Sequence, residues 1–429
     1  MKSKKLIFLL LFLYFVTIHL FSGAFTYYPG GDDDEKKIYK KAQRQYDIGN
    51  YETSVEYYKQ LVKLKPAKFI YNYELALIIF HELNQKSQSV PYFEAAQKIL
   101  TKDSIPDLYF FLGQAYQSDG KYDNAINSFL YYQNIDSNFV KVSVTRYINA
   151  CNYGKKIQSE PDENINVINI GNTINSEYSE YTSVFIPSSS DMLFTSRRHT
   201  NIYDELIEAI YVAEYDDDNY NSPEKIDSIE KYSNLVLDIN EFESIVNISP
   251  DEKSIIIYFD PYLYVSENID GIWQKPEKLG ENINFNFSNR HASITADGNQ
   301  IFFSGYERKQ ENNVNIFYST KQDDGKWGQA VKISDKINTN KNEDSPEISN
   351  DGKTLYFSSN GHKGMGGYDI FKSEFVDGEW TEPKNMTYPI NSAGDDIYFK
   401  YYEKDNVAFL SSNRSGGYGK MDIYKVIFK

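Results

Sequence analysis

One phrase occurs three times in the second half of the chain and limits how that half can fold. It reads GIWQKPEKLGENIN at 271–284, GKWGQAVKISDKIN at 325–338 and GEWTEPKNMTYPIN at 378–391. In each copy a Gly stands two residues before the Trp, and Ile-Asn begins ten residues after it. Repetition with fixed internal spacing predicts a series of similar structural units.

A second element recurs upstream of each phrase. An Asp-Gly or similar polar pair stands between two apolar, β-rich runs, and Gly accepts the positive φ that a tight turn requires. Each copy therefore predicts a hairpin of two strands. The clear copies span 248–259, 294–305 and 348–359, and the looser copies span 186–197 and 402–413.

A third strand is predicted after each hairpin, at 209–214, 262–267, 315–320, 369–374 and 422–427. In the middle three copies the Trp phrase then leads into a fourth strand, which is expected to end at Ile-Asn. Four short antiparallel strands are the content of one propeller blade. Trp273, Trp327 and Trp380 should therefore mark the same turn in three blades and pack between neighbouring sheets.

The number of blades follows from the closing Ile-Asn pairs, which begin at Ile174, Ile239, Ile283, Ile337 and Ile390. The last unit stops after its third strand at Lys429, and an unmatched copy of the fourth-strand phrase lies at 166–178, before the first hairpin. We expect that copy to complete the last blade and close the ring. The prediction is five blades, or six if the long first unit holds another.

The first half of the chain shows a helical periodicity instead. Two stretches place small residues, glycines and aromatics at spacings that resemble a tetratricopeptide (TPR) unit, in which small residues let two helices approach and Gly allows the turn. These positions are Ala42, Tyr46, Gly49, Tyr51, Ser54, Tyr58, Leu61 and Pro66 in one stretch, and Leu112, Gly113, Tyr116, Gly120, Tyr122, Ala125, Phe129 and Tyr132 in the other.

A weaker copy lies between these two stretches, with Ala76, Leu83, Tyr92 and Ala95 at the corresponding positions, and 138–157 has the pattern of a terminal capping helix. Three stacked hairpins would offer a groove for a peptide or a helix. The alternative is that so short a stack is only a spacer or a dimerisation arm.

The N-terminus has the pattern of a secretory signal peptide. Lys2, Lys4 and Lys5 precede a mostly apolar run from Leu6 to Phe21, and small residues follow up to Ala24. A retained membrane anchor is the competing interpretation. The predicted organisation is a signal peptide at 1–24, a linker at 25–35, TPR helices at 36–155 and a propeller at 160–429 in an exported protein, either periplasmic or associated with the outer membrane.

Charge and cysteine content exclude several functions. Sixty-one acidic and 45 basic residues give a formal net charge of -16, which would repel a phosphate backbone, so nucleic acid is not an expected partner. Cys151 is the single cysteine, so intrachain disulfides and CxxC motifs are excluded. We expect Cys151 to be a small buried apolar residue.

No motif for catalysis stands out. The sequence has no G-x-S-x-G elbow and no HExxH, and its five histidines are scattered. Asp251, Asp297, Asp351 and Asp405 recur at equivalent predicted turns, which favours a structural role over catalysis. Two Gly-rich loops, GHKGMGGYD and RSGGYGKMD, lie between strands, where Asp369 and Asp422 should bond to neighbouring backbone. We therefore predict no enzyme activity, and no catalytic, cofactor or metal site.

The pattern S-x-D-G-K-x-L-Y-F-S-S at 349–359 and the stretches GGYDIF and SSNRSGGYGKMDIY resemble the WD40-like periplasmic β-propeller repeats of Tol translocation protein B and its relatives. The resemblance covers roughly residues 166–429. TPR hairpins before such a propeller resemble envelope proteins of Bacteroidota, some of which serve the type IX secretion and gliding apparatus. Many of these carry a following OmpA-like peptidoglycan-binding domain. The sequence ends at the propeller, so peptidoglycan binding is not expected to carry over.

Together these observations predict an α+β multidomain protein that acts as a non-enzymatic adaptor for envelope proteins, in type IX secretion or in outer-membrane assembly. Its TPR groove would hold one partner and a face of its propeller another. The alternative function is a glycan-binding or carbohydrate-active five-bladed propeller. Acids and aromatics that converge on one channel mouth would favour that alternative, whereas a channel without paired acids would favour the adaptor.

Overall fold

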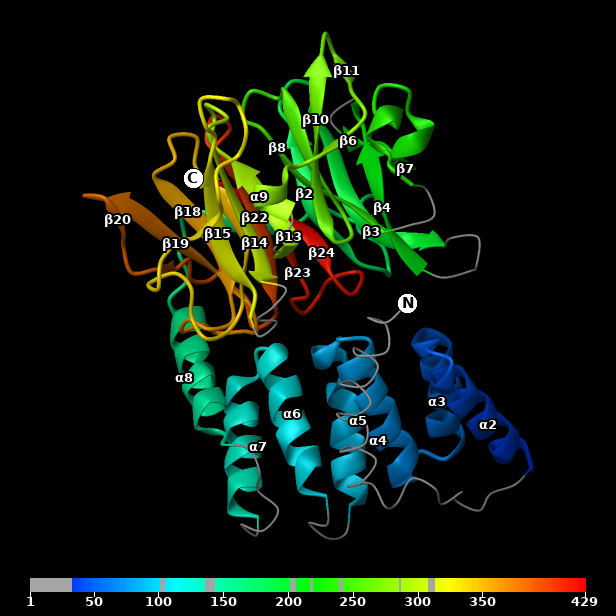
Figure 1. Cartoon of the computed structure of the whole chain (residues 1–429). Coiled ribbons are helices and arrows are strands. Elements are labelled where there is room, and N and C mark those ends of the chain that lie inside the picture. Colours follow the sequence, from blue (N-terminus) through cyan, green and yellow to red (C-terminus); the bar gives the residue numbers. More distant parts are fainter. Residues whose placement is uncertain are drawn as a thin grey trace.

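The chain has a helical part followed by a β part. In Figure 1 the helical part lies below the β part. A computed structural model describes residues 33–100, 105–135, 143–200, 206–216, 219–238, 242–284, 287–307 and 313–429. The predicted fold class, helical repeats followed by an all-β propeller, is confirmed. The expected signal peptide and residues 25–32 of the expected linker lie outside the described residues.

Three helical hairpins and a final helix make up the helical part. They stand side by side in chain order (Figure 1), so the three stacked units and the terminal helix are as predicted. The hairpins are α2 (Asp33–Asp47) with α3 (Tyr51–Leu64), α4 (Phe69–Leu77) with α5 (Lys86–Ile99), and α6 (Pro106–Ser118) with α7 (Tyr122–Asn134), and α8 (Thr145–Ser159) follows them.

Small residues bring the paired helices close together. An ideal Cβ on Gly113 of α6 would lie only 2.6 Å from the ring of Phe129 on α7, so no larger residue fits there without movement. In the first hairpin the Ser54 hydroxyl donates to the carbonyl of Ala42 at 2.9 Å. Gly49 has φ +80°, as the tight turn between α2 and α3 requires.

The middle hairpin is irregular where the repeat pattern is weakest. After α4 the chain continues into a π-helical turn at Ile78–Glu82, in which each backbone hydrogen bond spans five residues instead of the four of an α-helix. Phe80 of this turn packs edge-on against Phe93 of α5, with ring centroids 5.9 Å apart. Both rings belong to the buried core that runs from α4 to α8.

Helix α2 begins earlier than expected. Residues 33–35, assigned above to the linker, form its first turn. Acidic side chains are favourable there because they oppose the partial positive charge of the helix N-terminus. Glu35 is buried and accepts a hydrogen bond from Tyr71 of α4 at 2.6 Å, which ties this turn to the second hairpin.

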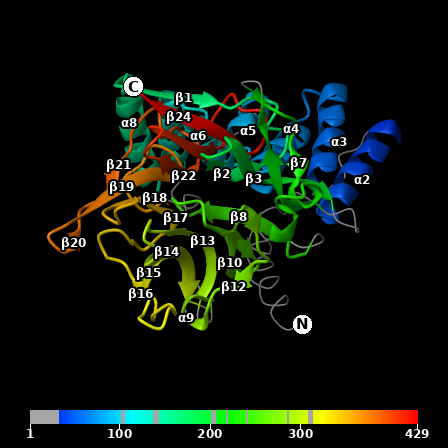
Figure 2. The same ribbon diagram turned by 90° about the horizontal axis from the view of Figure 1, so that it is seen from above.

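Over its described residues the β part contains five antiparallel sheets of four or five strands, besides one two-stranded hairpin. Their first strands are neighbours in the ring order β2, β8, β13, β17, β22, and β22 again neighbours β2. Figure 2 shows several of the sheets from above. Blade 1 has β2 (Glu180–Ile186), β3 (Asp191–Thr200), β4 (Leu206–Ala213) and β7 (Glu224–Lys225), and blade 2 has β8 (Glu243–Ile248), β9 (Ser254–Phe259), β10 (Tyr262–Ile269), β11 (Ile272–Trp273) and β12 (Glu277–Lys278). Blade 3 has β13 (Phe287–Ile294), β14 (Gln300–Glu307), β15 (Asn315–Thr320) and β16 (Val331–Lys332), and blade 4 has β17 (Glu343–Ile348), β18 (Thr354–Ser359), β19 (Asp369–Val376), β20 (Glu379–Trp380) and β21 (Lys384–Asn385). Blade 5 has β22 (Asp396–Tyr402), β23 (Val407–Ser412), β24 (Asp422–Phe428) and β1 (Ile165–Asn169).

The ring has five blades rather than six. The extra length of the first unit forms a small hairpin of β5 (Tyr215–Asp216) and β6 (Asn219–Tyr220) and two short 3-10 turns. The ring closes as predicted, because β1 pairs antiparallel with β24, from Ile165 opposite Phe428 to Asn169 opposite Tyr424. The first and last strands of the propeller therefore share one sheet and leave no open seam.

The three tryptophans lie between consecutive blades, as predicted. Trp273 belongs to the buried cluster shared by blades 1 and 2, and half-buried Trp327 packs on the cluster shared by blades 2 and 3. Trp380 of blade 4 meets Phe302 of blade 3 edge-on, with ring centroids 6.1 Å apart. Large aromatic rings at these positions fill the space that opens between radiating sheets.

The expectation that the fourth strand runs to Ile-Asn is wrong. The fourth strands end earlier, at Lys278, Lys332 and Asn385, and Ile-Asn lies in a following turn or, in blade 2, at the end of the short helix α9 (Glu281–Asn284). The reason is a side-chain contact: Asn391 Nδ2 donates to the carbonyl of Ile370 at 2.9 Å, and Ile370 N–H donates to Asn391 Oδ1 at 2.6 Å. The buried amide thus continues the backbone ladder of the third strand. The same pair of bonds joins Asn175 to Ile423, Asn284 to Leu263, and Asn338 to Ile316. The pair at 239–240 lies outside the described residues.

The helical part is joined to one end of the propeller. Met365, between β18 and β19, is 1% exposed and belongs to the same buried core as α6, α7 and α8. Nearby, the ammonium of Lys363 lies 4.7 Å from the ring centre of Tyr153 on α8. On the other side of the junction, Lys420 of the β23–β24 loop forms an ion pair with Glu52 of α3. The two Gly-rich loops are therefore part of the interdomain contact.

Candidate functional site

The acids expected at the hairpin turns are structural. Asp351 accepts hydrogen bonds from the Ser349 hydroxyl at 2.7 Å and from Lys353 N–H at 3.0 Å, and these bonds hold the pKa of Asp351 below its usual value. Asp251 and Asp297 repeat this arrangement, and Asp405 lies in the corresponding turn of blade 5. These turns lie at the end of the propeller away from the helices.

A second set of acids was not identified from the sequence. A buried carboxylate begins the first strand of four blades, at Glu180, Glu243, Glu343 and Asp396. Glu343 accepts from the N–H and hydroxyl of Thr339 at 2.7 and 2.8 Å and from the Ser359 hydroxyl at 2.8 Å. Glu180, Glu343 and Asp396 each stand five residues after the Asn of an Ile-Asn pair, which is a signal that the sequence contains.

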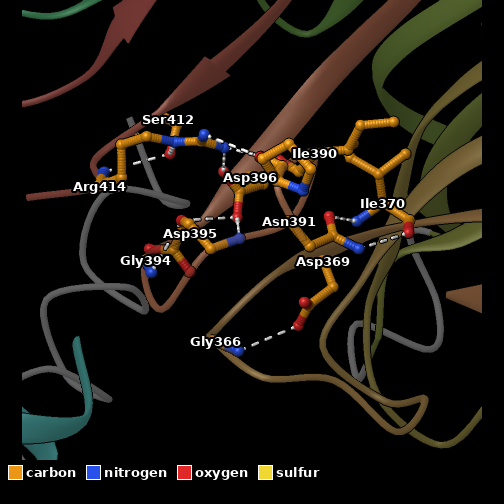
Figure 3. A network of polar contacts seen from close by, with 12 residues as sticks. Gly366, Asp369, Ile370, Ile390, Asn391, Gly394, Asp395, Asp396, Ser412 and Arg414 are labelled. Carbon is orange, nitrogen blue, oxygen red and sulfur yellow. Dashed lines mark hydrogen bonds and ion pairs between the residues drawn. The ribbon is translucent and has the colours of Figure 1, made fainter. Parts of the chain in front are cut away.

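Cationic or imidazole side chains complete three of these anchors, and Figure 3 shows the one in blade 5. Arg414 donates to the Ser412 hydroxyl at 3.1 Å, to Asp396 at 2.6 Å and to the carbonyl of Ile390 at 2.6 Å. Arg198 makes the same three contacts in blade 1. In blade 4 the His362 Nε2 lies 2.8 Å from the carbonyl of Ile337, so this histidine takes the place of an arginine.

Asp369 and Asp422 hold the Gly-rich loops, as predicted. Asp369 accepts from the backbone N–H of Met365 at 3.0 Å and of Gly366 at 3.2 Å, a contact visible in Figure 3, and Asp422 accepts from Tyr418 N–H at 2.6 Å. Burial, with Asp396 nearby, raises the pKa of Asp369 to about 8. These carboxylates shape loops that face the helices.

Polar side chains from four blades block the middle of the channel. Lys400 Nζ lies 3.0 Å from Glu347 Oε1 and 2.7 Å from Asn247 Oδ1, and all three side chains are at least nine-tenths buried. His291 lies beside them, and its burial, together with the charge of Lys400, lowers its pKa to about 3. The carboxylate in the channel is thus paired with a cation rather than with a second acid.

Above this polar layer the channel widens into a cavity of about 530 Å³ at the end that faces the helices. We call this space the mouth cavity. Its walls combine aromatic rings, three charged side chains and small hydroxyls. The lining residues are Ser179, Tyr181, Thr182, Arg197, Glu208, Phe242, Ser244, Tyr258, Asp260, Tyr306, Ile397, Tyr398 and Met421. Acids and aromatics therefore converge on one channel mouth.

Tyrosine hydroxyls orient the two carboxylates of the mouth cavity. Tyr258 donates to Asp260 Oδ1 at 2.7 Å in blade 2. In blade 1 a hydrogen bond joins Tyr181 to Glu208, and burial, with the charge of Glu208, raises the pKa of Tyr181 well above its usual value. Tyr181 in turn stacks on Tyr398 of blade 5, with ring centroids 5.7 Å apart.

A β-bulge interrupts the first strand of every blade at the level of this cavity. At three of the bulges a residue other than glycine has positive φ: Thr182 (+47°), Ser345 (+53°) and Tyr398 (+56°). Such conformations cost on the order of 1–3 kcal/mol each, and the cost is unusual for β-branched Thr. Bulges turn side chains away from the regular pleat, and here Thr182 and Tyr398 line the cavity.

Where side chains are described, no group of three or more His, Cys, Asp or Glu is placed to hold a metal ion. Cys151 is fully buried, as expected, and burial raises the pKa of its thiol to about 12. Over the same residues no helix has the length and apolarity needed to cross a bilayer.

A family model of the tetratricopeptide repeat matches residues 36–68 and 106–138, which include the first and third hairpins. No curated protein matches the sequence. Similar solved structures include a protein assigned as TolB from Agrobacterium tumefaciens, which is 16% identical, covers 60% of this chain and 87% of its own, and has a TM-score of 0.37.

Two further structures are similar over one part each. The type III secretion translocator chaperone SycD from Yersinia enterocolitica is 16% identical over 30% of this chain and 90% of its own, with a TM-score of 0.25. An alpha-L-arabinofuranosidase from Lactobacillus brevis is 10% identical over 63% of this chain and 93% of its own, with a TM-score of 0.36. None of these similarities identifies an activity or a partner. The chain is a protein of tetratricopeptide repeats followed by a five-bladed β-propeller.

Proposed function

We propose that this protein is a non-enzymatic, exported scaffold that binds other proteins of a bacterial envelope. Tetratricopeptide hairpins are stacked units that present extended binding surfaces, which supports a role in protein binding. The acids that recur around the propeller bond to loops and to neighbouring strands, so they are engaged in structure rather than available for chemistry.

The observation that carries this proposal is the shared core at the junction. Met365 of the propeller is buried in the core formed by α6, α7 and α8, so the two parts are held in one relation to each other. A rigid pair of surfaces loses little conformational entropy when two partners bind. A scaffold that sets the relative position of its partners needs this property.

Exposed apolar side chains lie on both parts and mark where partners could bind. On α7, Leu130 is 42% and Tyr131 is 44% exposed. In Figure 1 the β11 hairpin points up and the β20 hairpin points left, both away from the helices. Ile272 on the β11 hairpin is 58% exposed and Val376 on the β20 hairpin is 50% exposed. Paired apolar residues at projecting tips are typical of contact sites.

The envelope location belongs to this proposal as well. Lysines followed by an apolar run and small residues up to Ala24 support export to the periplasm or to the periplasmic side of the outer membrane. Residues 349–359 and 366–371 resemble periplasmic propeller repeats, and the arrangement of tetratricopeptide hairpins before such a propeller supports a role in type IX secretion or outer-membrane assembly. We propose no peptidoglycan binding and no nucleic-acid partner.

The test is affinity purification of the full chain from envelope extract, with co-purified proteins quantified by mass spectrometry. Two variants are compared with the wild type: Leu130→Glu with Tyr131→Glu on α7, and Ile272→Asp with Val376→Asp on the propeller tips. All four side chains are exposed, so both variants should keep the unfolding midpoint of the wild type. A scaffold predicts two sets of partners, each lost from one variant only.

Two outcomes would contradict the proposal. If nothing specific is recovered with the wild-type chain, it is not a scaffold of the envelope. If both variants retain every partner, these surfaces do not bind them. A control variant, Asp324→Asn on an exposed turn between β15 and β16, should recover the same proteins as the wild type.

A further inference from the structure

We propose that the mouth cavity is a binding site for a neutral saccharide of one or two sugar units. This site goes beyond the scaffold function, which uses the helices and the hairpin tips. A volume of about 530 Å³ is within the range of small-molecule pockets.

The aromatic side chains supply apolar faces around the cavity. Tyr181, Tyr258, Tyr306 and Tyr398 come from blades 1, 2, 3 and 5, and each is half-buried. A pyranose ring presents a face of C–H groups that packs on an aromatic ring, with its hydroxyls pointing outward in the ring plane. Tyrosine suits such a ligand because its ring is apolar while its hydroxyl can hydrogen-bond.

Two carboxylates are positioned to accept hydrogen bonds from sugar hydroxyls. Asp260 is held at 2.7 Å by the hydroxyl of Tyr258, and Glu208 is bonded to Tyr181. Each carboxylate has several acceptor sites, so one bond to a tyrosine leaves capacity for a ligand. Hydrogen bonds to charged groups are the stronger ones, and orienting the acceptor beforehand reduces the entropy lost on binding.

The charges at the mouth favour a neutral ligand over an ionic one. Arg197 stands on the same wall as Glu208 and also interacts with Glu52 of α3, so its charge is already opposed by carboxylates. An anion would face two carboxylates, Glu208 and Asp260. A cation would be attracted by these carboxylates but would be repelled by Arg197 on the same wall. A polyhydroxylated ligand can donate to the acids and accept from the guanidinium without an unpaired charge.

The cavity has a polar floor and a strained wall, and both point to a bound small molecule. On the floor side, Lys400 and Asn247 lie two and three residues beyond the lining residues Tyr398 and Ser244 along the same strands, in the buried polar layer that also holds Glu347. Behind the wall, the ring of His291 lies 5.6 Å from that of Tyr398, and its buried Nδ1 has no hydrogen-bond partner within the described residues. Tyr398 and Thr182 have positive φ at this wall. Among the described residues, positive φ at a residue other than glycine is found at three of the five bulges, so the propeller fold does not require it in every blade.

The experiment is saturation-transfer difference NMR on the full chain with cellobiose, maltose, lactose and N,N′-diacetylchitobiose at millimolar concentration, followed by titration to obtain Kd. At least one disaccharide should bind. Asp260→Asn and Glu208→Gln should each raise Kd about tenfold, the effect of losing one hydrogen bond to a charged acceptor. Tyr258→Phe, which keeps the ring but releases Asp260, should act in the same direction.

The matched control is Asp324→Asn, on an exposed turn outside the cavity, which should leave Kd unchanged. Unfolding midpoints verify that all variants fold. The proposal is overturned if none of the four disaccharides shows transfer, or if transfer persists unchanged in both carboxylate variants. It is also overturned if a lysine peptide, and no saccharide, perturbs the tyrosine signals, since the cavity would then be a cation site.

Discussion

Lys400 Nζ lies 3.0 Å from Glu347 Oε1 in the centre of the propeller, and the same ammonium donates to Asn247 at 2.7 Å. The three side chains come from blades 5, 4 and 2, so one cation connects blades that are not all neighbours. Burial raises the pKa of Glu347, whereas the charge and hydrogen bond of Lys400 lower it. Glu347 therefore depends on Lys400 to remain charged inside the channel.

The first prediction concerns this pair. Lys400→Met should lower the free energy of unfolding by about 3–5 kcal/mol, because Glu347 would remain buried without its cation. Urea unfolding followed by tryptophan fluorescence measures the change, since all three tryptophans lie in the propeller.

The control for this prediction is a double variant. Adding Glu347→Gln to Lys400→Met removes the uncompensated charge and should restore more than half of the lost stability. If the double variant is as unstable as the single one, the loss comes from packing around Lys400, and the ionic explanation is wrong.

The second prediction concerns the repeated side-chain amide. Asn391→Ala leaves the N–H of Ile370 without its partner in a buried setting, which costs about 1–3 kcal/mol, while the carbonyl of Ile370 still accepts from Met386 N–H. Asn299→Ala, at an exposed turn where the amide bonds only to Asp297, should change stability by less than about 0.5 kcal/mol. Equal losses in urea unfolding of the two variants would contradict this role of Asn391.

Much of the fold could be predicted because it repeats. Trp273, Trp327 and Trp380 recur at one spacing since the same gap between sheets must be filled in each blade. The end of the fourth strand could not be placed, because Asn391 extends the ladder through its side chain. A local sequence pattern does not distinguish such an amide from backbone pairing.

The mouth cavity could not be predicted, for the opposite reason. Asp260 and Glu208 belong to no recurring element, and they are brought together only when the ring closes. Their partners Tyr258 and Tyr181 look like ordinary strand residues in the sequence. The bulge that re-aims Thr182 also has no mark in the sequence, since positive φ is rare for Thr.

The third prediction is a pH dependence within the helices. Burial raises the pKa of Glu74 to about 7, although the hydroxyls of Tyr58 and Tyr39 donate to it. The folded protein therefore binds this proton more tightly than the unfolded chain does. The stability that the proton provides is complete below about pH 4.5 and is lost as the pH rises through 7.

Glu74→Gln tests this dependence, because glutamine keeps the acceptor oxygen and cannot ionise. Relative to the wild type, the variant should gain stability between pH 5 and 8, with a total on the order of 3 kcal/mol for a shift of this size. Thermal unfolding followed by circular dichroism at 222 nm measures the difference. A constant difference across this pH range would show that Glu74 is ionised in both states.

The fourth prediction separates the two kinds of contact at the junction. Met365→Ala removes a side chain buried in the core of α6, α7 and α8, at a cost of about 2–5 kcal/mol. Lys420→Ala removes the ion pair between Lys420 and Glu52, whose side chains are 26% and 44% exposed, and should cost less than about 1 kcal/mol.

Circular dichroism at 222 nm follows the helices, and tryptophan fluorescence follows the propeller. Met365→Ala should therefore split one thermal transition into two, with the helices melting first, whereas Lys420→Ala should leave the two signals coincident. If Lys420→Ala splits them instead, the ion pair rather than the shared core holds the helices to the propeller.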